Sequence, residues 1–380
     1  MDKSLNRIHF LDIMRGFAVV VMVMGHSIDS VLSPEARATE AFRWYDMFRG
    51  FTAPMFLFVA GYAFMVATAR RWEDYRAFGK PVLKRLSRVA LLFVIGYALH
   101  FPFFSLTKIL TNASSSDLAQ LFQVDILHCV AAGLLILHIV LLLTPSLRAF
   151  AHTMTVLAAG IALASPFIWS IDFAPLVSPP LSPYFNQTQL SMFPVFPYAA
   201  YLFSGVVVGY YFLEARRTEQ ETVFIKRILA LAICAIVLAF VFDRAPVSLY
   251  PEYDFWKTSP NLFVIRIGIV MLITLAFYYI RRLPEPLERS LVRLGQASLM
   301  VYALHLVIVY GSSMNKGLYQ LIGQTLQAHY AVATGVFVLG LMIAVVFGWN
   351  YLRSRHFIPT RIIQVGLVSS LLYIFISRPW

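Results

Sequence analysis

The chain has 380 residues, of which 59% are hydrophobic and only 13% are charged, and its formal net charge is +12. A soluble domain carries about 25% charged residues, so this composition excludes an ordinary soluble protein and indicates an all-α polytopic membrane protein. The positive charge alone would suggest a nucleic-acid partner, which the placement of the charges disfavours.

Apolar segments along the chain predict about eleven membrane-spanning helices, since a helix needs about 20 apolar residues to cross a bilayer. We expect them to form a single transmembrane domain over residues 1–380, a bundle around a central pore or cavity. The last span is the weakest of the set. In chain order the predicted spans are 9–31, 50–69, 89–106, 124–143, 151–171, 191–213, 225–242, 262–280, 295–312, 330–350 and 362–377.

Lysine and arginine are concentrated in alternate connecting segments, most strongly between Arg70 and Arg88. This pattern follows the positive-inside rule if the N-terminus is cytoplasmic and the C-terminus is outside. The basic charge therefore indicates topology and attraction to anionic lipid, with no nucleic-acid partner. We expect a multi-pass protein, of a bacterial inner membrane, whose first span acts as its own anchor in the absence of a cleavable signal peptide.

The first span contains two ionisable residues, Arg15 and His26. Such groups are costly inside a bilayer and indicate a functional site that faces the bundle interior or a wet cavity. On a helix, Asp12, His26 and Asp29 lie within about 60° of Arg15, and the eleven steps from Arg15 to His26 cover about 16 Å. The spacing suits a reaction with a phosphorylated donor at the inner mouth and an acceptor at the outer mouth.

Histidine suits the acceptor side because its imidazole takes and returns a proton near neutral pH. Asp29, three residues after His26, could hold the tautomer of the imidazole or stabilise the imidazolium. Two simpler interpretations stay open. Asp12 and Arg15 could form a structural ion pair, and His26 could be an interfacial histidine bound to a backbone carbonyl.

Further polar residues are predicted to gather near His26. Asp125 and His128 lie near the outer end of span four, Arg266 lies about a turn below the outer surface in span eight, and His100 ends span three. Acid, cation and imidazole together would suit an acceptor site with an oxyanion stabiliser. The alternative is a buried structural pair between Asp125 and Arg266.

Several segments resemble known families of membrane acyltransferases. The run LDIMRGFAVVVMVMGH, in which ten residues separate Arg15 and His26, resembles the signature first helix of the acyltransferase 3 family. The segment from Phe48 to Phe64 is more similar to the related heparan-alpha-glucosaminide N-acetyltransferase catalytic domain family. Three later segments match the expected order of that superfamily: KRLSRVALLF, FPVFPYAAYLFSGVVVGYYF and LGQASLMVYALH.

This resemblance implies that an acyl group, commonly acetyl, moves from cytoplasmic acyl-CoA to a sugar on the far side of the membrane. It also implies that His26 is the catalytic histidine and that Arg15 lies on the donor path. Ala60 stands where many relatives have serine, so the subfamily and therefore the acceptor stay open. The sequence also leaves open O- or N-acylation, an acyl-histidine intermediate and the oligomeric state. A transporter with an intramembrane Arg, Asp and His path is the alternative, although no inverted repeat is found.

Acyl-CoA is expected as a co-substrate, with no permanently bound cofactor. Arg85 and Arg88 at the inner mouth are candidates to hold CoA, or else they set topology and bind lipid phosphate. His305, midway along span nine, could line the channel between donor and acceptor or bond a neighbouring helix. The sequence shows no zinc-type spacing of His and Cys, no glycine-rich phosphate loop and no G-x-S-x-G motif, so we expect no metal site.

Overall fold

The computed structural model describes residues 8–188, 190–244, 250, 254–280, 283–355 and 357–378, and it is all-α over these residues. In this part of the chain eight helices are long and apolar enough to cross a membrane. A ninth span is formed if the bent pair α14 and α15 is counted as one. The protein is therefore a multi-pass integral membrane protein, and the count of eleven spans stays a prediction.

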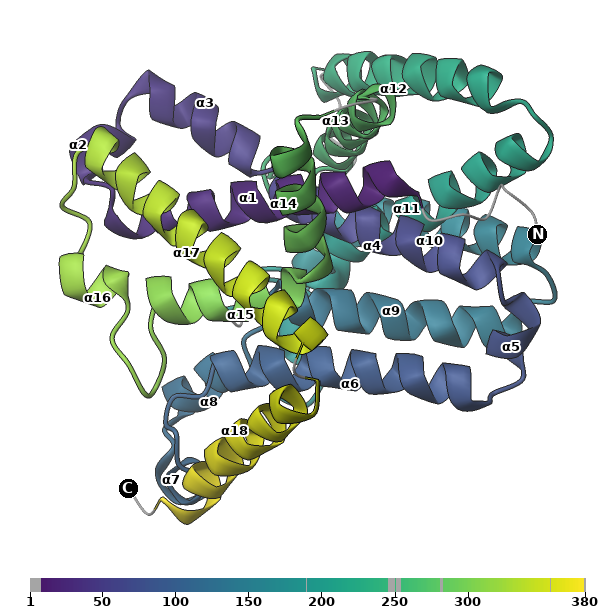
Figure 1. Ribbon diagram of the computed structural model, residues 1–380. Helices are drawn as coiled ribbons and strands as arrows, with labels where there is room; N and C mark the ends of the chain where they lie inside the picture. The colour runs from purple at the N-terminus through teal and green to yellow at the C-terminus, as the bar shows by residue number, and fades with distance from the viewer. Residues whose placement is uncertain are drawn as a thin grey trace. The chain divides into compact units, whose positions relative to one another are not determined.

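Figure 1 labels the helices, which fall into two compact units. Unit 1 comprises Met1–Met14, Phe51–Gly96 and Gln123–Arg282, and unit 2 comprises Arg15–Gly50, Tyr97–Phe122 and Leu283–Trp380. Helix α1 (His9–Val31) is unbroken and contributes to both units. The predicted first span is confirmed as a helix with the same bounds.

Unit 1 is built around the close packing of α4 and α11. Two glycines make this packing possible, because a Cβ on Gly61 would lie 1.8 Å from the carbonyl oxygen of Leu202 and one on Gly205 would lie 2.0 Å from that of Phe58. Small residues commonly allow such close approach between membrane helices. The helices of this unit are α4 (Thr52–Ala69), α5 (Trp72–Arg76), α6 (Lys80–Leu99), α9 (Ile126–Leu143), α10 (Leu147–Trp169), α11 (Val195–Arg217), α12 (Glu221–Asp243) and α13 (Pro260–Tyr279).

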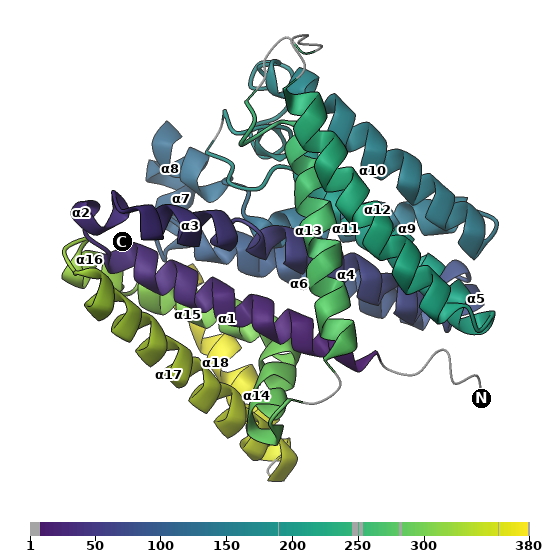
Figure 2. The same ribbon diagram turned by 90° about the horizontal axis from the view of Figure 1, so that it is seen from above.

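Helices α12 and α13 pack against each other (Figure 2). Much of the surface of α12 is exposed and apolar, for example at Leu231 and Val241, as expected for a helix that faces lipid. Helix α6 belongs to unit 1 up to Gly96.

Unit 2 is organised around the second part of α1. A cluster of buried residues joins Ile28 and Val31 of α1 to Ala331 of α17, and Gly335 of α17 lies against Met24 and Ile28. The other helices of this unit are α2 (Pro34–Arg37), α3 (Glu40–Arg49), α7 (Leu106–Asn112), α8 (Ser115–Leu121), α14 (Glu285–Gln296), α15 (Ser298–Val309), α16 (Leu318–Ile322), α17 (Ala328–Arg355) and α18 (Phe357–Ser377).

Two of the predicted spans depart most from the helices. The span predicted at 89–106 lies on α6, which begins at Lys80 and ends at Leu99, because Pro102 has no N–H to continue the helix and disfavours helical backbone before it. The span predicted at 295–312 contains α15, which is shorter than the prediction and meets the preceding helix α14 at an angle of 84°. Helix α14 is amphipathic and charged, as in helices that lie along an interface, whereas α15 is apolar.

Candidate active site

Two imidazoles from distant parts of the sequence meet within unit 2. His26 of α1 and His305 of α15 lie with Nδ1 of His26 2.9 Å from Nε2 of His305. Their rings are nearly parallel, at 8°, with centroids 5.2 Å apart. His305 is fully buried and its Nδ1 lies 2.8 Å from the carbonyl oxygen of Val301, one turn earlier on α15. The sequence predicts that His305 either lines the channel or bonds a neighbouring helix, and the structure shows the second, with His26 of α1 as the partner.

Asp29, one turn after His26, is held by two arginines. Its Oδ1 lies 2.5 Å from Nη1 of Arg37, and its Oδ2 lies 2.9 Å from Nη1 of Arg49. Arg37 also donates to the backbone carbonyls of Leu32 and Asp29. No hydrogen bond joins Asp29 to His26 in the described part of the chain. The residue beside Nδ1 of His26 is therefore His305 and not Asp29, which the sequence suggested as the orienting group.

Local capping brings these arginines back to α1. Ser33 caps α2 by accepting from the N–H of Ala36, and Thr39 caps α3 by accepting from the N–H of Phe42. Side-chain caps of this kind define where a short helix begins. The connector after α1 thus folds into two short helices that end at Arg37 and Arg49, and both arginines reach the carboxylate of Asp29.

Gly25 makes room for Arg49 beside His26. A Cβ at this position would lie 2.9 Å from Cδ of Arg49 and 3.8 Å from the hydroxyl of Tyr45. Tyr310, just after α15, meets the ring of His26 edge to face at a centroid distance of 5.8 Å. We refer to the resulting group as the His26 cluster, and its members are His26, Asp29, Arg37, Arg49, His305 and Tyr310.

Sequence reasoning did not identify Arg37, Arg49 or Tyr310. Asp29 offered a signal, because a carboxylate near the end of a membrane helix requires a cation nearby. The sequence does not tell which of the neighbouring cations takes that place.

Arg15 lies within the same unbroken helix as His26. The eleven steps between them correspond to about 16 Å along the axis of α1. Its side chain is half-buried, and α1 comes so close to α14 here that a Cβ on Gly16 would lie 1.9 Å from the carbonyl oxygen of Leu291. The place of Arg15 on a donor path stays a prediction.

Arg85 occupies a half-buried position in unit 1. Its Nη1 donates to Oγ1 of Thr68 at 2.9 Å, and its guanidinium lies 3.3 Å from the ring centroid of Tyr75. Its charged neighbours are two further cations, Arg71 and Arg88, and within the described residues no carboxylate pairs with it. An arginine that is always charged and surrounded by cations is suited to bind an anion. Arg88 is exposed on the same helix.

Asp125 and His128 form a local pair in unit 1. Asp125 caps α9 by accepting from the N–H groups of Leu127 and His128, and its Oδ1 lies 2.8 Å from Nδ1 of His128. Both side chains are buried. This is the geometry of a helix cap, which satisfies donors at the start of α9.

Arg266 and His100 lie in other surroundings. Arg266 is a charged neighbour of Tyr198 and Tyr201 within unit 1, and the partner that the structure shows for Asp125 is His128. His100 follows the last residue of α6 in unit 2, where its N–H donates to the carbonyl of Tyr97. Of the predicted acceptor-side residues, the structure brings His305 to His26 and His128 to Asp125.

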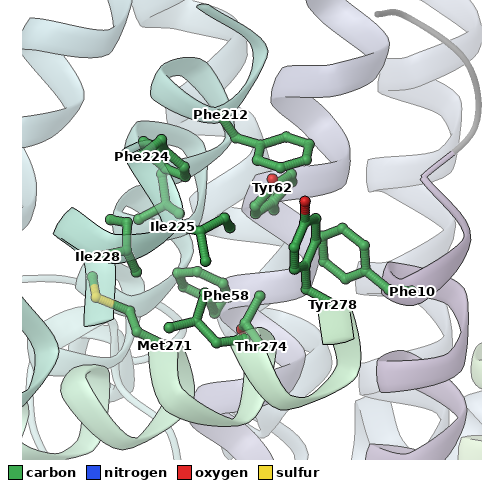
Figure 3. A pocket seen from close by; sticks show the side chains of 12 residues that line it. Phe10, Phe58, Tyr62, Phe212, Phe224, Ile225, Ile228, Met271, Thr274 and Tyr278 are labelled. Atoms are coloured by element: carbon green, nitrogen blue, oxygen red, sulfur yellow. The ribbon is translucent and has the colours of Figure 1, made fainter. Parts of the chain in front are cut away.

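An open apolar pocket of about 310 Å³ lies within unit 1 (Figure 3). Its polar edge is the hydroxyl of Tyr278, which donates to Oε1 of Glu221 at 2.9 Å. No imidazole, carboxylate or cation lines it, so it does not carry the chemistry. The lining residues are Phe10, Phe58, Tyr62, Val208, Phe212, Phe224, Ile225, Ile228, Met271, Thr274, Leu275 and Tyr278. Across the described chain, no three His, Cys, Asp or Glu residues are grouped to hold a metal ion.

Comparison with known families identifies the domain. The model of the acyltransferase 3 family, described as an acyltransferase domain, matches residues 8–351. The match includes the helices that carry His26, His305, Arg85 and Arg266. No curated protein gives a significant match to the chain.

Proposed function

Since the chain belongs to the acyltransferase 3 family and is a membrane acyltransferase, we propose that it moves an acyl group, most simply acetyl, from cytoplasmic acyl-CoA to a glycan. The acceptor is a hydroxyl or amine on the far side of a bacterial inner membrane. In this topology the N-terminus is cytoplasmic and the C-terminus is outside, as the placement of basic residues indicates.

The observation that carries this proposal is the pair of hydrogen-bonded imidazoles. His26 lies in a membrane-spanning helix, is partly exposed, and has Nδ1 2.9 Å from Nε2 of His305. A histidine held in a fixed orientation can take the proton of an attacking hydroxyl or amine and return it to the leaving group. Acyl transfer from a thioester needs this proton movement.

Charges around His26 support an acceptor site. Arg37 and Arg49 hold the carboxylate of Asp29 from the connector that follows α1, and Arg49 passes beside Gly25. Polar side chains that are fixed by one another suit the recognition of sugar hydroxyls, because little ordering is left to occur on binding.

The donor is expected at cations on the cytoplasmic side. Arg85 has the hydroxyl of Thr68 and the ring of Tyr75 as its neighbours, with Arg88 close by. These arginines would bind the phosphates of CoA, since guanidinium groups match phosphate oxygens in geometry and charge. Arg15 would lie further along the path of the donor on α1.

The test is transfer of label from acetyl-CoA labelled in the acetyl group. Membranes that contain the wild-type protein, the His26→Ala variant or the His138→Phe variant are supplied with a panel of glycans. We expect label on a glycan with the wild type and with His138→Phe but not with His26→Ala. Free CoA thiol should be released in an amount equal to the label transferred. A transporter would move solute without releasing thiol. Label that reaches a glycan equally with His26→Ala would contradict the proposal.

A further inference from the structure

The hydrogen bond between the two imidazoles has a defined direction. It is fixed at its far end, where Nδ1 of His305 lies 2.8 Å from the carbonyl oxygen of Val301. A carbonyl oxygen only accepts hydrogen bonds, so Nδ1 of His305 must carry the hydrogen. The backbone of α15 therefore fixes which nitrogen of His305 is protonated.

The charge state of His305 follows from its surroundings. Its side chain is fully buried, and no carboxylate of the described chain pairs with it. A buried imidazolium without an anionic partner would be costly, so His305 is neutral. A neutral imidazole has one N–H, which leaves Nε2 of His305 with a lone pair that accepts a hydrogen bond.

The accepting Nε2 of His305 determines which nitrogen of His26 carries the hydrogen. Its Nδ1 lies 2.9 Å from the accepting Nε2 of His305, so Nδ1 of His26 donates and carries the hydrogen. Neutral His26 therefore has its lone pair on Nε2. We propose that His305 is a positioning residue, anchored by Val301, which fixes the tautomer and orientation of His26 so that Nε2 of His26 is the reactive nitrogen.

This inference rests on the proposed acyl transfer and names the atom that performs it. Nε2 of His26 takes the proton of the acceptor hydroxyl while the oxygen forms a bond to the acyl carbon. The C–S bond of the thioester then breaks, and the thiolate of CoA receives the proton from Nε2. The products are the acylated glycan and free CoA thiol. Through both proton transfers, Nδ1–H of His26 stays bonded to Nε2 of His305.

The same assignment holds if the acyl group rests on His26 during the reaction, because Nδ1 is already occupied. With His305 as the orienting residue, Asp29 is not needed to orient His26. Both oxygens of that carboxylate are held by Arg37 and Arg49. A neutral imidazole thus takes the orienting place that a carboxylate occupies in the Ser-His-Asp triad.

A second histidine, His138, has the same backbone bond as His305 but no imidazole partner, and it therefore provides a matched control. His138 on α9 has the same bond, with Nδ1 2.7 Å from the carbonyl oxygen of Leu134 one turn earlier. Its Nε2 is buried and has no hydrogen-bond partner among the described residues. His138 and His305 therefore share the backbone anchor, and only His305 faces another imidazole.

The test compares three variants of the full-length protein in the acetyl-transfer assay. His305→Phe keeps a planar ring but has no acceptor, so kcat should fall by about 10² to 10⁴ while the KM for acetyl-CoA changes little. In His305→Gln the amide oxygen replaces Nε2 as the acceptor, so kcat should recover at least about tenfold over His305→Phe. His138→Phe should keep the activity of the wild type.

A ¹⁵N NMR measurement on protein with labelled histidine checks the tautomer directly. The signals that disappear in His26→Gln should belong to an imidazole with Nδ1 protonated and Nε2 bare, and the reverse assignment would overturn the inference. Full activity of His305→Phe, or no recovery in His305→Gln, would also overturn the inference. If His26→Ala is inactive in the same assay, the proposed function still stands. Absence of transfer by the wild type would instead reject the proposed function.

Discussion

His128 and His26 both have a side-chain partner at Nδ1, but the partners come from very different distances along the chain. His128 pairs with Asp125, three residues away, within the cap of α9. His26 pairs with His305, which is 279 positions away and lies on another helix. A local pair is explained by the need to satisfy the donors at a helix end. The distant pair has no such explanation, which is why we place the chemistry there.

Among the charged residues around His26, the largest effect is expected from Asp29→Ala. The substitution removes the carboxylate shared by Arg37 and Arg49, which leaves Arg37 without its ion pair and Arg49 paired only with Asp46. Because an unpaired charge at a partly buried site is costly, we expect kcat to fall about 100-fold and the free energy of unfolding to fall by about 1–3 kcal/mol. Kinetics and thermal unfolding in detergent measure both.

Asp46→Ala is the matched control for Asp29→Ala. Asp46 also pairs with Arg49, but its side chain is 50% exposed. Exposed ion pairs contribute about 0–1 kcal/mol, so Asp46→Ala should change kcat by less than about threefold. Equal losses in the two variants would show that the effect comes from Arg49 alone and not from the carboxylate beside His26.

A smaller effect is expected from Gly25→Ala. The added Cβ would lie 2.9 Å from Cδ of Arg49, so the arginine stem must shift away from His26. Since this stem is flexible, we expect a loss of about tenfold in kcat rather than loss of the fold. Gly340→Ala on α17 is the control, because nothing lies within 4 Å of its added Cβ. A wild-type rate in Gly25→Ala would show that Arg49 need not pass beside His26.

The smallest effect on activity is expected at the local pair. Asp125→Ala removes the cap of α9 and should lower the free energy of unfolding by about 0.5–2 kcal/mol. The kcat of the folded fraction should stay within about threefold of the wild type, since a cap acts on stability and not on proton transfer. A large loss of kcat with unchanged stability would place Asp125 and His128 at the acceptor, as the sequence suggested.

The sequence predicted the parts of this protein that depend on local pattern. Hydropathy located the helices, and the run that contains Arg15 and His26 indicated both a site and a family, because apolar length and residue spacing are properties of one segment. The bend between α14 and α15 was not predicted. Hydropathy placed the start of the apolar segment near residue 295, but it does not show that the charged segment before it is also a helix or at what angle the two helices meet.

The partners within the His26 cluster were equally hidden. The sequence offered Asp29 to His26 because the two share a helix face, but Asp29 is taken by Arg37 and Arg49 after the connector folds back. The choice of His305 as partner depends on how α15 packs in unit 2. Spacing along one helix offers only Asp29, and tertiary packing supplies His305 instead.

The central claim, that His26 carries acyl transfer across the membrane, is tested most directly in sealed vesicles that contain the purified protein. Labelled acetyl-CoA is added on the side of the basic connectors and a glycan acceptor is enclosed on the other side. We expect label on the enclosed glycan with the wild type and a loss of at least about 10³-fold with His26→Gln, whose fold is checked by thermal unfolding. Equal transfer by a folded His26→Gln protein would contradict the account.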